Sequence, residues 1–252
     1  SVLTANINTL TYLNVSYQNI SNLTGIEDFV ALSDLECSYN QMTSLDVSYN
    51  TVLSEFYCTN NQLTSLNVSG ATALTHFHCE DNQLASLDVS TNTALTDLHC
   101  HNNELTNIDL SNNTLLSLLD CHNNELINID LSNNTLLEFL ECPYNQLTTL
   151  NLTQNTVLEQ WNCEDNQLTG LDVRNGNNTN FTWFRCSNNP NLNCINVDDS
   201  TWSANNWTVT NGDIDPQHYF SNNCPPSSIQ EHTTNKELLK ITDILGRETK
   251  QT

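Results

Sequence analysis

Basic residues are scarce in this chain, and most of the few present stand near its end. The 252 residues include 6 lysines and arginines against 29 aspartates and glutamates, which gives a net charge of -23. Before residue 231 the only basic residues are Arg174 and Arg185. A surface with so little positive charge repels phosphate backbones and anionic lipid headgroups. We therefore expect no nucleic-acid partner, whereas cations, neutral glycans and basic proteins stay open as ligands.

Long apolar runs and familiar catalytic motifs are also missing. No stretch approaches the roughly 20 apolar residues that span a bilayer, and no signal peptide opens the chain. Because the first residues already resemble a repeat, we expect the chain to start inside a longer precursor. The sequence contains no G-x-S-x-G elbow, phosphate-binding loop or H-E-x-x-H. We predict neither membrane insertion nor enzymatic activity.

Cysteine, by contrast, recurs with a fixed period. Seven of the ten cysteines stand at intervals of 21 residues, and an eighth, Cys186, comes two residues late. A fixed period in this range is typical of a solenoid, in which each repeat buries its apolar residues only against its neighbours. The seven are Cys37, Cys58, Cys79, Cys100, Cys121, Cys142 and Cys163.

Each 21-residue repeat contains two similar halves. In residues 74–94, LTHFHCEDNQLASLDVSTNTA, the first half follows L-x-x-L-x-C-x-x-N and the second follows L-x-x-L-D-V-S-x-N. The alternation in L-x-C and L-D-V has the period of a strand, which points Leu and Cys inward and the residues around them outward. We therefore predict a β-rich solenoid with short parallel strands on two faces and few helices. The Asn that closes each half is predicted to bond backbone groups where the chain turns.

These repeats resemble leucine-rich repeats. The pattern L-x-x-L-x-C-x-x-N-x-L is similar to the conserved segment of that family, with Cys at the usual third Leu, and the nested halves resemble the bacterial IRREKO class. The resemblance implies a right-handed solenoid that binds other molecules. Residues 20–41 are similar to the opening repeats of secreted flavobacterial members, with a short helical turn expected in LTGIEDF.

Four parts follow from these patterns: opening repeats at 1–41, a leucine-rich repeat solenoid at 42–189, a C-terminal cap at 190–226, and a linker and tail at 227–252. The cap is expected to seal the last apolar turn with its aromatic residues, Trp202, Trp207, Tyr219 and Phe220. The tail sequence KELLKITDILGRETK resembles the first part of the C-terminal sorting domain of type IX secretion, which implies export.

The periodic cysteines admit two interpretations. Thiolates are good ligands for soft metals, but each periodic Cys occupies the place of Leu or Val in the sister half. We predict that they are buried as small hydrophobic side chains, and that their parallel orientation disfavours disulfides between turns. Cys194 and Cys224 stand outside the period, and we predict a disulfide between them. Such a bond fits an oxidising compartment and hence a secreted or cell-surface protein.

Five of the seven histidines fall at outward positions of three adjacent L-x-C strands. Residues i and i+2 of a strand share a face, and the next strand lies about 4.8 Å away. His78 beside His99, and His101 beside His122, are therefore predicted to come within reach of a shared ion. Imidazole and carboxylate groups suit zinc, copper or nickel. Solvated positions without a ligand remain an alternative. The candidate metal ligands are His78, His99, His101, Asp120 and His122, with Asp97 and Glu80 as further donors.

The same surface could instead contact a macromolecule. Phe139 and Trp183 could stack on sugars or pack on a protein, whereas Trp161 occupies an inward position and is expected in the core. We predict an extracellular recognition or adhesion module for a protein or polysaccharide. A metal-binding surface protein and a structural spacer of a larger adhesin are the alternatives. The candidate binding residues are Tyr57, His76, His78, Asp97, His99, His101, Asp120, His122, Phe139 and Trp183.

The second predicted face is chemically monotonous. Its outward positions are mostly Ser, Asp, Asn and Thr. Such a regular array could bind calcium or a repetitive glycan. Because L-D-L-S-x-N is common in leucine-rich repeats of many functions, we expect an ordinary solvated face.

Overall fold

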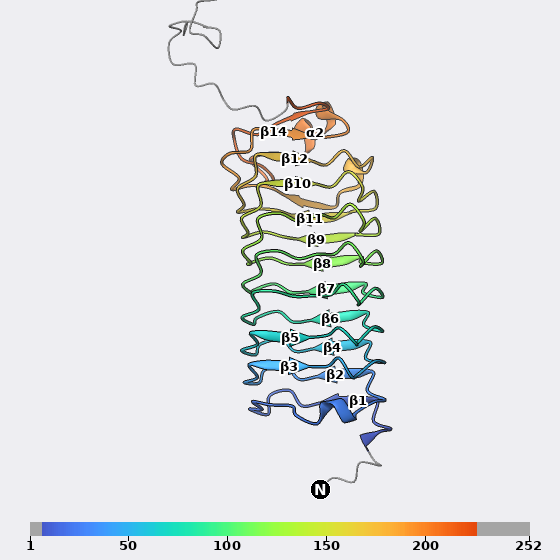
Figure 1. Ribbon diagram of the computed structural model, residues 1–252. Coiled ribbons are helices and arrows are strands. Elements are labelled where there is room, and N and C mark those ends of the chain that lie inside the picture. Colours follow the sequence, from blue (N-terminus) through green and yellow to red (C-terminus); the bar gives the residue numbers. More distant parts are fainter. Residues whose placement is uncertain (1–6, 226–252) are drawn as a thin grey trace, which may run out of the picture.

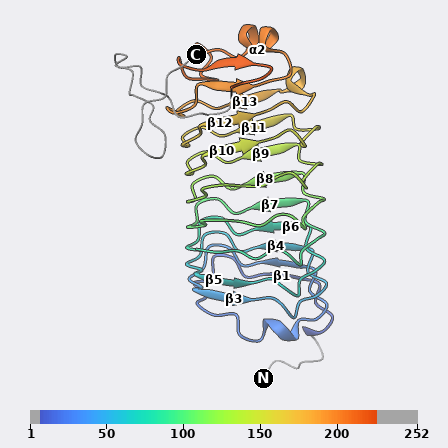
Figure 2. The same ribbon diagram turned by 45° about the horizontal axis from the view of Figure 1, so that its top comes forward.

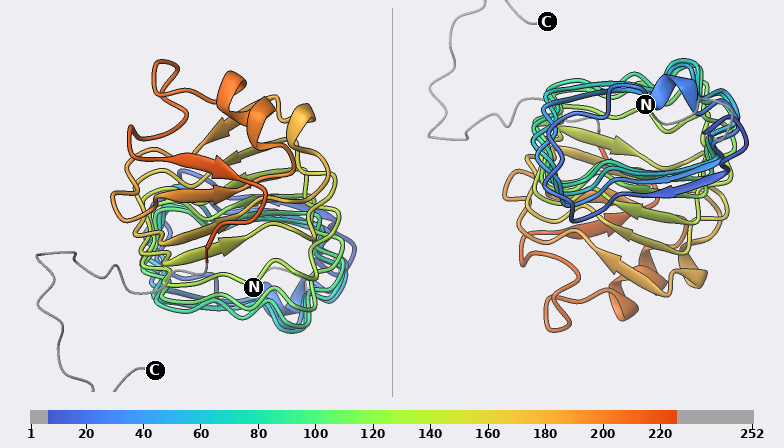
Figure 3. Two further views of the ribbon diagram at one scale, coloured as in Figure 1. Left: turned by 90° about the horizontal axis from the view of Figure 1, so that it is seen from above. Right: turned by 90° about the horizontal axis from the view of Figure 1, so that it is seen from below.

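The turns of the chain stack into one column in the computed structural model, which describes residues 7–225 (Figure 1). One strand from each of nine successive turns joins a parallel sheet with the order β1-β2-β4-β6-β7-β8-β9-β11-β13. Seen along the stack, each turn is a flattened loop, and the C-terminal turns are displaced from the N-terminal ones (Figure 3). The predicted solenoid is therefore confirmed.

The nine-stranded sheet is built from three-residue strands, because each L-x-C segment stays extended only between two bends. Its central residues point inward, and from Leu35 to Trp161 their side chains are fully buried. The strands are β1 (Tyr12–Asn14), β2 (Asp34–Glu36), β4 (Glu55–Tyr57), β6 (His76–His78), β7 (Asp97–His99), β8 (Leu118–Asp120), β9 (Phe139–Glu141), β11 (Gln160–Asn162) and β13 (Trp183–Arg185).

The second face carries strands only at its two ends. Near the N-terminus β3 (Ser44–Asp46) pairs with β5 (Ser65–Asn67), and near the C-terminus β10 (Thr149–Asn151), β12 (Gly170–Asp172), β14 (Cys194–Asn196) and β15 (Tyr219–Ser221) form a four-stranded sheet. The turns between them are ordered but contain no strand on this face (Figure 2). In these turns an Asp side chain accepts the backbone N–H two residues later, as Asp109 does from Ser111 at 2.9 Å.

Asparagine side chains hold the turns together, as the sequence predicts. The Asn103 amide donates to the carbonyls of Cys79 and Cys100, both at 3.1 Å, and its oxygen accepts the Leu84 N–H at 3.0 Å. Equivalent Asn residues make the same contacts in neighbouring turns. Each Asn therefore satisfies peptide groups that would otherwise be buried without partners.

The chain bends sharply two residues after each periodic cysteine. The residues there have φ between 49° and 57°, in the left-handed region. Asn and Asp tolerate this region better than other residues with a side chain, and they occupy six of the eight positions, with Tyr at the other two. The eight residues are Tyr39, Asn60, Asp81, Asn102, Asn123, Tyr144, Asp165 and Asn188.

All eight periodic cysteines are buried free thiols, as predicted. Burial raises the pKa of Cys37 to about 12. It also raises the pKa of the next two periodic cysteines in the stack. A thiol that stays protonated is a poor nucleophile and a poor metal ligand. The cysteine column is therefore part of the hydrophobic core.

Aromatic side chains close the C-terminal end of the core. The rings of Phe184 and Trp207 lie 4.4 Å apart and those of Trp202 and Trp207 lie 5.7 Å apart. Helix α2 (Ser200–Asn206) begins after Asp199, whose carboxylate accepts the first free N–H groups of the helix. The predicted disulfide between Cys194 and Cys224 is confirmed, with the two Cα atoms 5.8 Å apart.

Two short 3-10 turns complete the described elements, η1 (Ile26–Asp28) in the expected LTGIEDF segment and η2 (Asn178–Asn180). No helix among residues 7–225 is long and apolar enough to cross a membrane. The segment predicted to resemble a sorting domain lies outside the described residues.

Candidate binding face and histidine cluster

The outward side chains of the nine-stranded sheet form in-register columns, which we call the sheet face. Strand pairing aligns equivalent positions of successive turns, for example Asp97 with Leu118 and His99 with Asp120. The first strand positions give Tyr12, Asp34, Glu55, His76, Asp97, Leu118, Phe139, Gln160 and Trp183. The third positions give Asn14, Glu36, Tyr57, His78, His99, Asp120, Glu141, Asn162 and Arg185.

Carboxylates dominate the N-terminal part of the sheet face. Burial raises the pKa of Asp34, and the neighbouring charges of Glu55 and Glu36 raise it further. The Tyr57 hydroxyl donates to Glu55 at 3.3 Å, and burial together with the Glu55 charge raises the pKa of Tyr57 to about 12. This part of the face therefore attracts cations.

The centre of the sheet face carries the predicted histidines. The rings of His78 and His99 lie 4.3 Å apart, with Asp97 between them. Asp97 Oδ1 is 3.6 Å from His78 Nε2 and 3.3 Å from His99 Nε2. His78 Nδ1 also lies 3.9 Å from Glu80. The predicted neighbour relation of His78 and His99 is confirmed.

Asp120 is the centre of a second group. Its Oδ2 lies 3.6 Å from His99 Nδ1 and 3.2 Å from His101 Nδ1. Its Oδ1 lies 2.6 Å from His122 Nδ1, in a hydrogen bond. The rings of His101 and His122 are stacked at 4.2 Å, which confirms that they are neighbours. We define the histidine cluster as His78, Asp97, His99, His101, Asp120 and His122.

Opposite charges that lie side by side shift the pKa values of His99, His122 and Asp120. Burial lowers the pKa of His99, but its contacts with Asp120 and Asp97 outweigh that effect and raise the pKa to about 10. The contact with Asp120 likewise raises the pKa of His122. Burial raises the pKa of Asp120, but the surrounding imidazoles outweigh it and bring that pKa far below the usual value. At neutral pH and without a ligand, His99 is an imidazolium between two carboxylates.

Apolar side chains follow on the C-terminal part of the sheet face. Leu118 and Phe139 are adjacent and half-buried, and Trp183 lies two strands beyond. The Arg185 guanidinium lies 6.0 Å from the centre of the Trp183 ring. Burial, with the nearby charge of Asp120, raises the pKa of Glu141 to about 7. This part of the face offers anchors for packing.

Eight of the ten candidate binding residues lie at outward strand positions of this face, and the other two, His101 and His122, follow β7 and β8 and contact Asp120. His76 is exposed and is the strand neighbour of Asp97, with its Nδ1 3.0 Å from the Thr75 hydroxyl. Trp161 is fully buried, as expected. Glu141 and Arg185 were not among the candidate residues. The alignment of outward positions that identified Asp120 and Trp183 as candidates also contains Glu141 and Arg185. The same alignment could therefore have identified these two residues.

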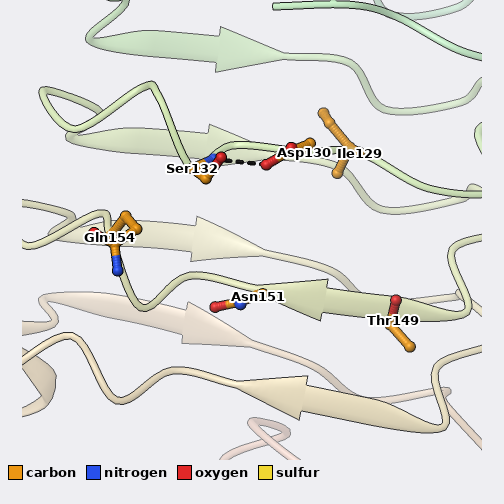
Figure 4. Close-up of a pocket in the computed structure, with 6 residues that line it drawn as sticks. All are labelled: Ile129, Asp130, Ser132, Thr149, Asn151 and Gln154. Carbon is orange, nitrogen blue, oxygen red and sulfur yellow. Dashed lines mark hydrogen bonds between the residues drawn. The ribbon is translucent and has the colours of Figure 1, made fainter. Parts of the chain in front are cut away.

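The second face has one shallow hollow of about 220 Å³ among the cavities described (Figure 4). Its Asp130 carboxylate already accepts the Ser132 N–H at 2.9 Å, and that hydrogen bonding lowers the pKa of Asp130. The carboxylate is thus engaged within its own turn. The lining residues are Ile129, Asp130, Ser132, Thr149, Asn151 and Gln154.

Solved structures with a similar fold are leucine-rich repeat proteins. An internalin, InlF, from Listeria monocytogenes is 20% identical, with 78% of this chain and 69% of that chain covered and a TM-score of 0.57. The leucine-rich repeat protein LIC12759 from Leptospira interrogans is 16% identical, with 73% and 54% covered and a TM-score of 0.56. The chain is therefore a leucine-rich repeat solenoid by fold.

A functional domain of InlJ from Listeria monocytogenes, described as including a cysteine ladder, is 28% identical. The match covers 77% of this chain and 59% of that chain, with a TM-score of 0.42. The chain thus spans less than two thirds of that relative. No family model and no curated protein matches the chain.

Proposed function

We propose that this chain is an extracellular recognition module that binds a protein partner through the sheet face. The observation that carries the proposal is the graded chemistry of that face, which runs from carboxylates through the histidine cluster to apolar side chains. Binding through repeat-built surfaces is the usual way in which solenoids act. An open sheet surface suits recognition better than catalysis, because catalytic sites are usually enclosed pockets.

The apolar end supplies the anchors of this interface. Aromatic side chains that become fully desolvated contribute most of the energy of protein interfaces, and Phe139 and Trp183 are placed for that role. The acidic end favours a partner with basic residues, since complementary charge speeds association and excludes acidic partners. We therefore expect a partner that is apolar at one end of its contact surface and basic at the other.

A location outside the cell is part of the proposal. The disulfide between Cys194 and Cys224 supports it, because such bonds persist in oxidising compartments. The resemblance of residues 236–250 to the start of a type IX sorting domain agrees with export.

Binding should be tested on arrays of secreted proteins, surface proteins and glycans. A double variant, Phe139→Ser with Trp183→Ser, is compared with the wild type and with Thr149→Ser, a control on the second face. The proposal expects a protein ligand that is lost only in the double variant. Loss of binding in Thr149→Ser, ligands that are glycans alone, or no ligand at all would reject it, the last result favouring a structural spacer.

A further inference from the structure

We propose that His99, His101 and Asp120 bind one divalent transition-metal ion of the zinc class, with His122 as a positioning residue. The site does not depend on the proposed recognition function, because metal binding is measured without a partner. Of the six residues in the histidine cluster, the proposal assigns three as metal ligands.

The first support is the spacing of the donor atoms. Asp120 Oδ2 lies 3.6 Å from His99 Nδ1 and 3.2 Å from His101 Nδ1, and ligand atoms of all three residues lie within 4.8 Å of one another. Zinc bonds of 2.0–2.2 Å in a tetrahedron place neighbouring ligands about 3.4 Å apart. Only small side-chain rotations are needed to bring the three atoms around one ion.

The second support is an unsatisfied atom. His101 Nδ1 is buried from solvent and makes no hydrogen bond among the described residues, although Asp120 lies close by. Buried polar atoms nearly always have a partner. A metal ion between His101 and Asp120 would supply that partner.

The third support is how the ligands are held. His122 Nδ1 is hydrogen-bonded to Asp120 Oδ1 at 2.6 Å, which leaves Oδ2 directed at His99 and His101. Asp97 lies 3.3 Å from His99 Nε2. His99 Nε2 can therefore keep its proton, while Nδ1 of the same ring faces Asp120. Such contacts orient the ligands of metal sites and raise their affinity.

Two imidazoles and one carboxylate form a donor set that zinc commonly has. A tetrahedral ion would keep one position open on the solvent side. The ligand side chains are 12–23% exposed, so the ion would be partly shielded by the sheet face. The cluster thus favours zinc over calcium, which prefers six or more oxygen ligands.

Isothermal titration with Zn²⁺ at neutral pH, on the full chain after chelator treatment, tests the site. We expect one saturable ion per chain, and Co²⁺ in its place should give the visible spectrum of a tetrahedral site. Asp120→Asn and His101→Ala should each weaken binding at least tenfold. Asp109→Asn, which removes an exposed carboxylate from the second face, should leave it unchanged.

The role of His122 is tested separately. His122→Ala should weaken binding about tenfold, and His122→Gln should restore most of the affinity because its amide can still donate to Asp120. Circular dichroism establishes that each variant is folded. If Asp120→Asn does not fold, the result for His101→Ala decides, since that side chain lies outside the core.

Three results would overturn the proposal. These are the absence of saturable heat in the wild type, an equal loss in Asp109→Asn, and binding that survives Asp120→Asn but is lost in Asp97→Asn. The last result would place the ion at the neighbouring group of His78, Asp97 and His99, whose ligand atoms also lie within 4.8 Å.

Discussion

Single side chains set the spacing between turns in this molecule. Asn103 and its equivalents bond carbonyls of their own and the preceding turn and an N–H of the preceding turn. Each of these Asn residues is buried within the stack. A residue that satisfies several buried peptide groups at once contributes more than one ordinary hydrogen bond.

Asn103→Ala should lower the free energy of unfolding by about 2–3 kcal/mol, because it leaves buried backbone groups without partners. Urea denaturation followed by circular dichroism measures the loss. The control is Asn107→Ala, an exposed position in the same turn, which should change stability by less than about 0.5 kcal/mol. Equal losses in the two variants would contradict the role assigned to the buried Asn.

The pairing of His99 with Asp120 should also make stability depend on pH in the metal-free protein. The His99 pKa is raised from 6.5 to about 10, so its contribution is complete below pH 6.5 and is lost as pH rises toward 10. The Asp120 pKa is lowered from 3.8, so its contribution is present above that pH and is lost on acidification.

Asp120→Asn removes this pairing. The difference in unfolding free energy between wild type and variant should therefore be largest between about pH 4 and 6.5 and should shrink toward pH 10. Urea titrations at several pH values, with a chelator present, measure that difference. A difference that stays constant with pH would show that Asp120 stabilises the fold only by packing.

At the scale of elements, short strands persist because each one pairs with its neighbours in the next turns. The sequence period predicted these strands, the inward cysteines and the outward columns, since a 21-residue repeat aligns equivalent positions. It did not predict that the second face lacks strands between Asn67 and Thr149. Polar residues of the same pattern stand in turns with and without strands on that face, so local sequence does not separate them.

The C-terminal elements depend on a covalent link. The disulfide joins β14 to the chain just after β15, across a sequence separation of 30. Replacing both Cys194 and Cys224 by Ser should destabilise the cap by about 3 kcal/mol, since the open chain regains conformational entropy. Hydrogen exchange should speed up in β14 and β15 and stay unchanged in β6 and β7, because repeats of a solenoid interact with their neighbours only. Uniform acceleration would contradict that locality.

At the scale of the whole molecule, one register determines both the core and the sheet face. The periodic cysteines fix which residues point inward, and thereby place five histidines on one outer surface. Sequence alone brought His78 near His99 and His101 near His122. It could not show that Asp120 connects three of these imidazoles, because side-chain rotamers and hydrogen bonds decide which atoms converge.

The most direct test is a crystal structure of the chain grown with zinc, with diffraction recorded at the zinc absorption edge. It examines the register and the site in one measurement. The account predicts a parallel sheet with His99 paired to Asp120, and one anomalous peak within bonding distance of His99 Nδ1, His101 Nδ1 and Asp120 Oδ2. A different strand register, or zinc bound only away from the sheet face, would contradict it.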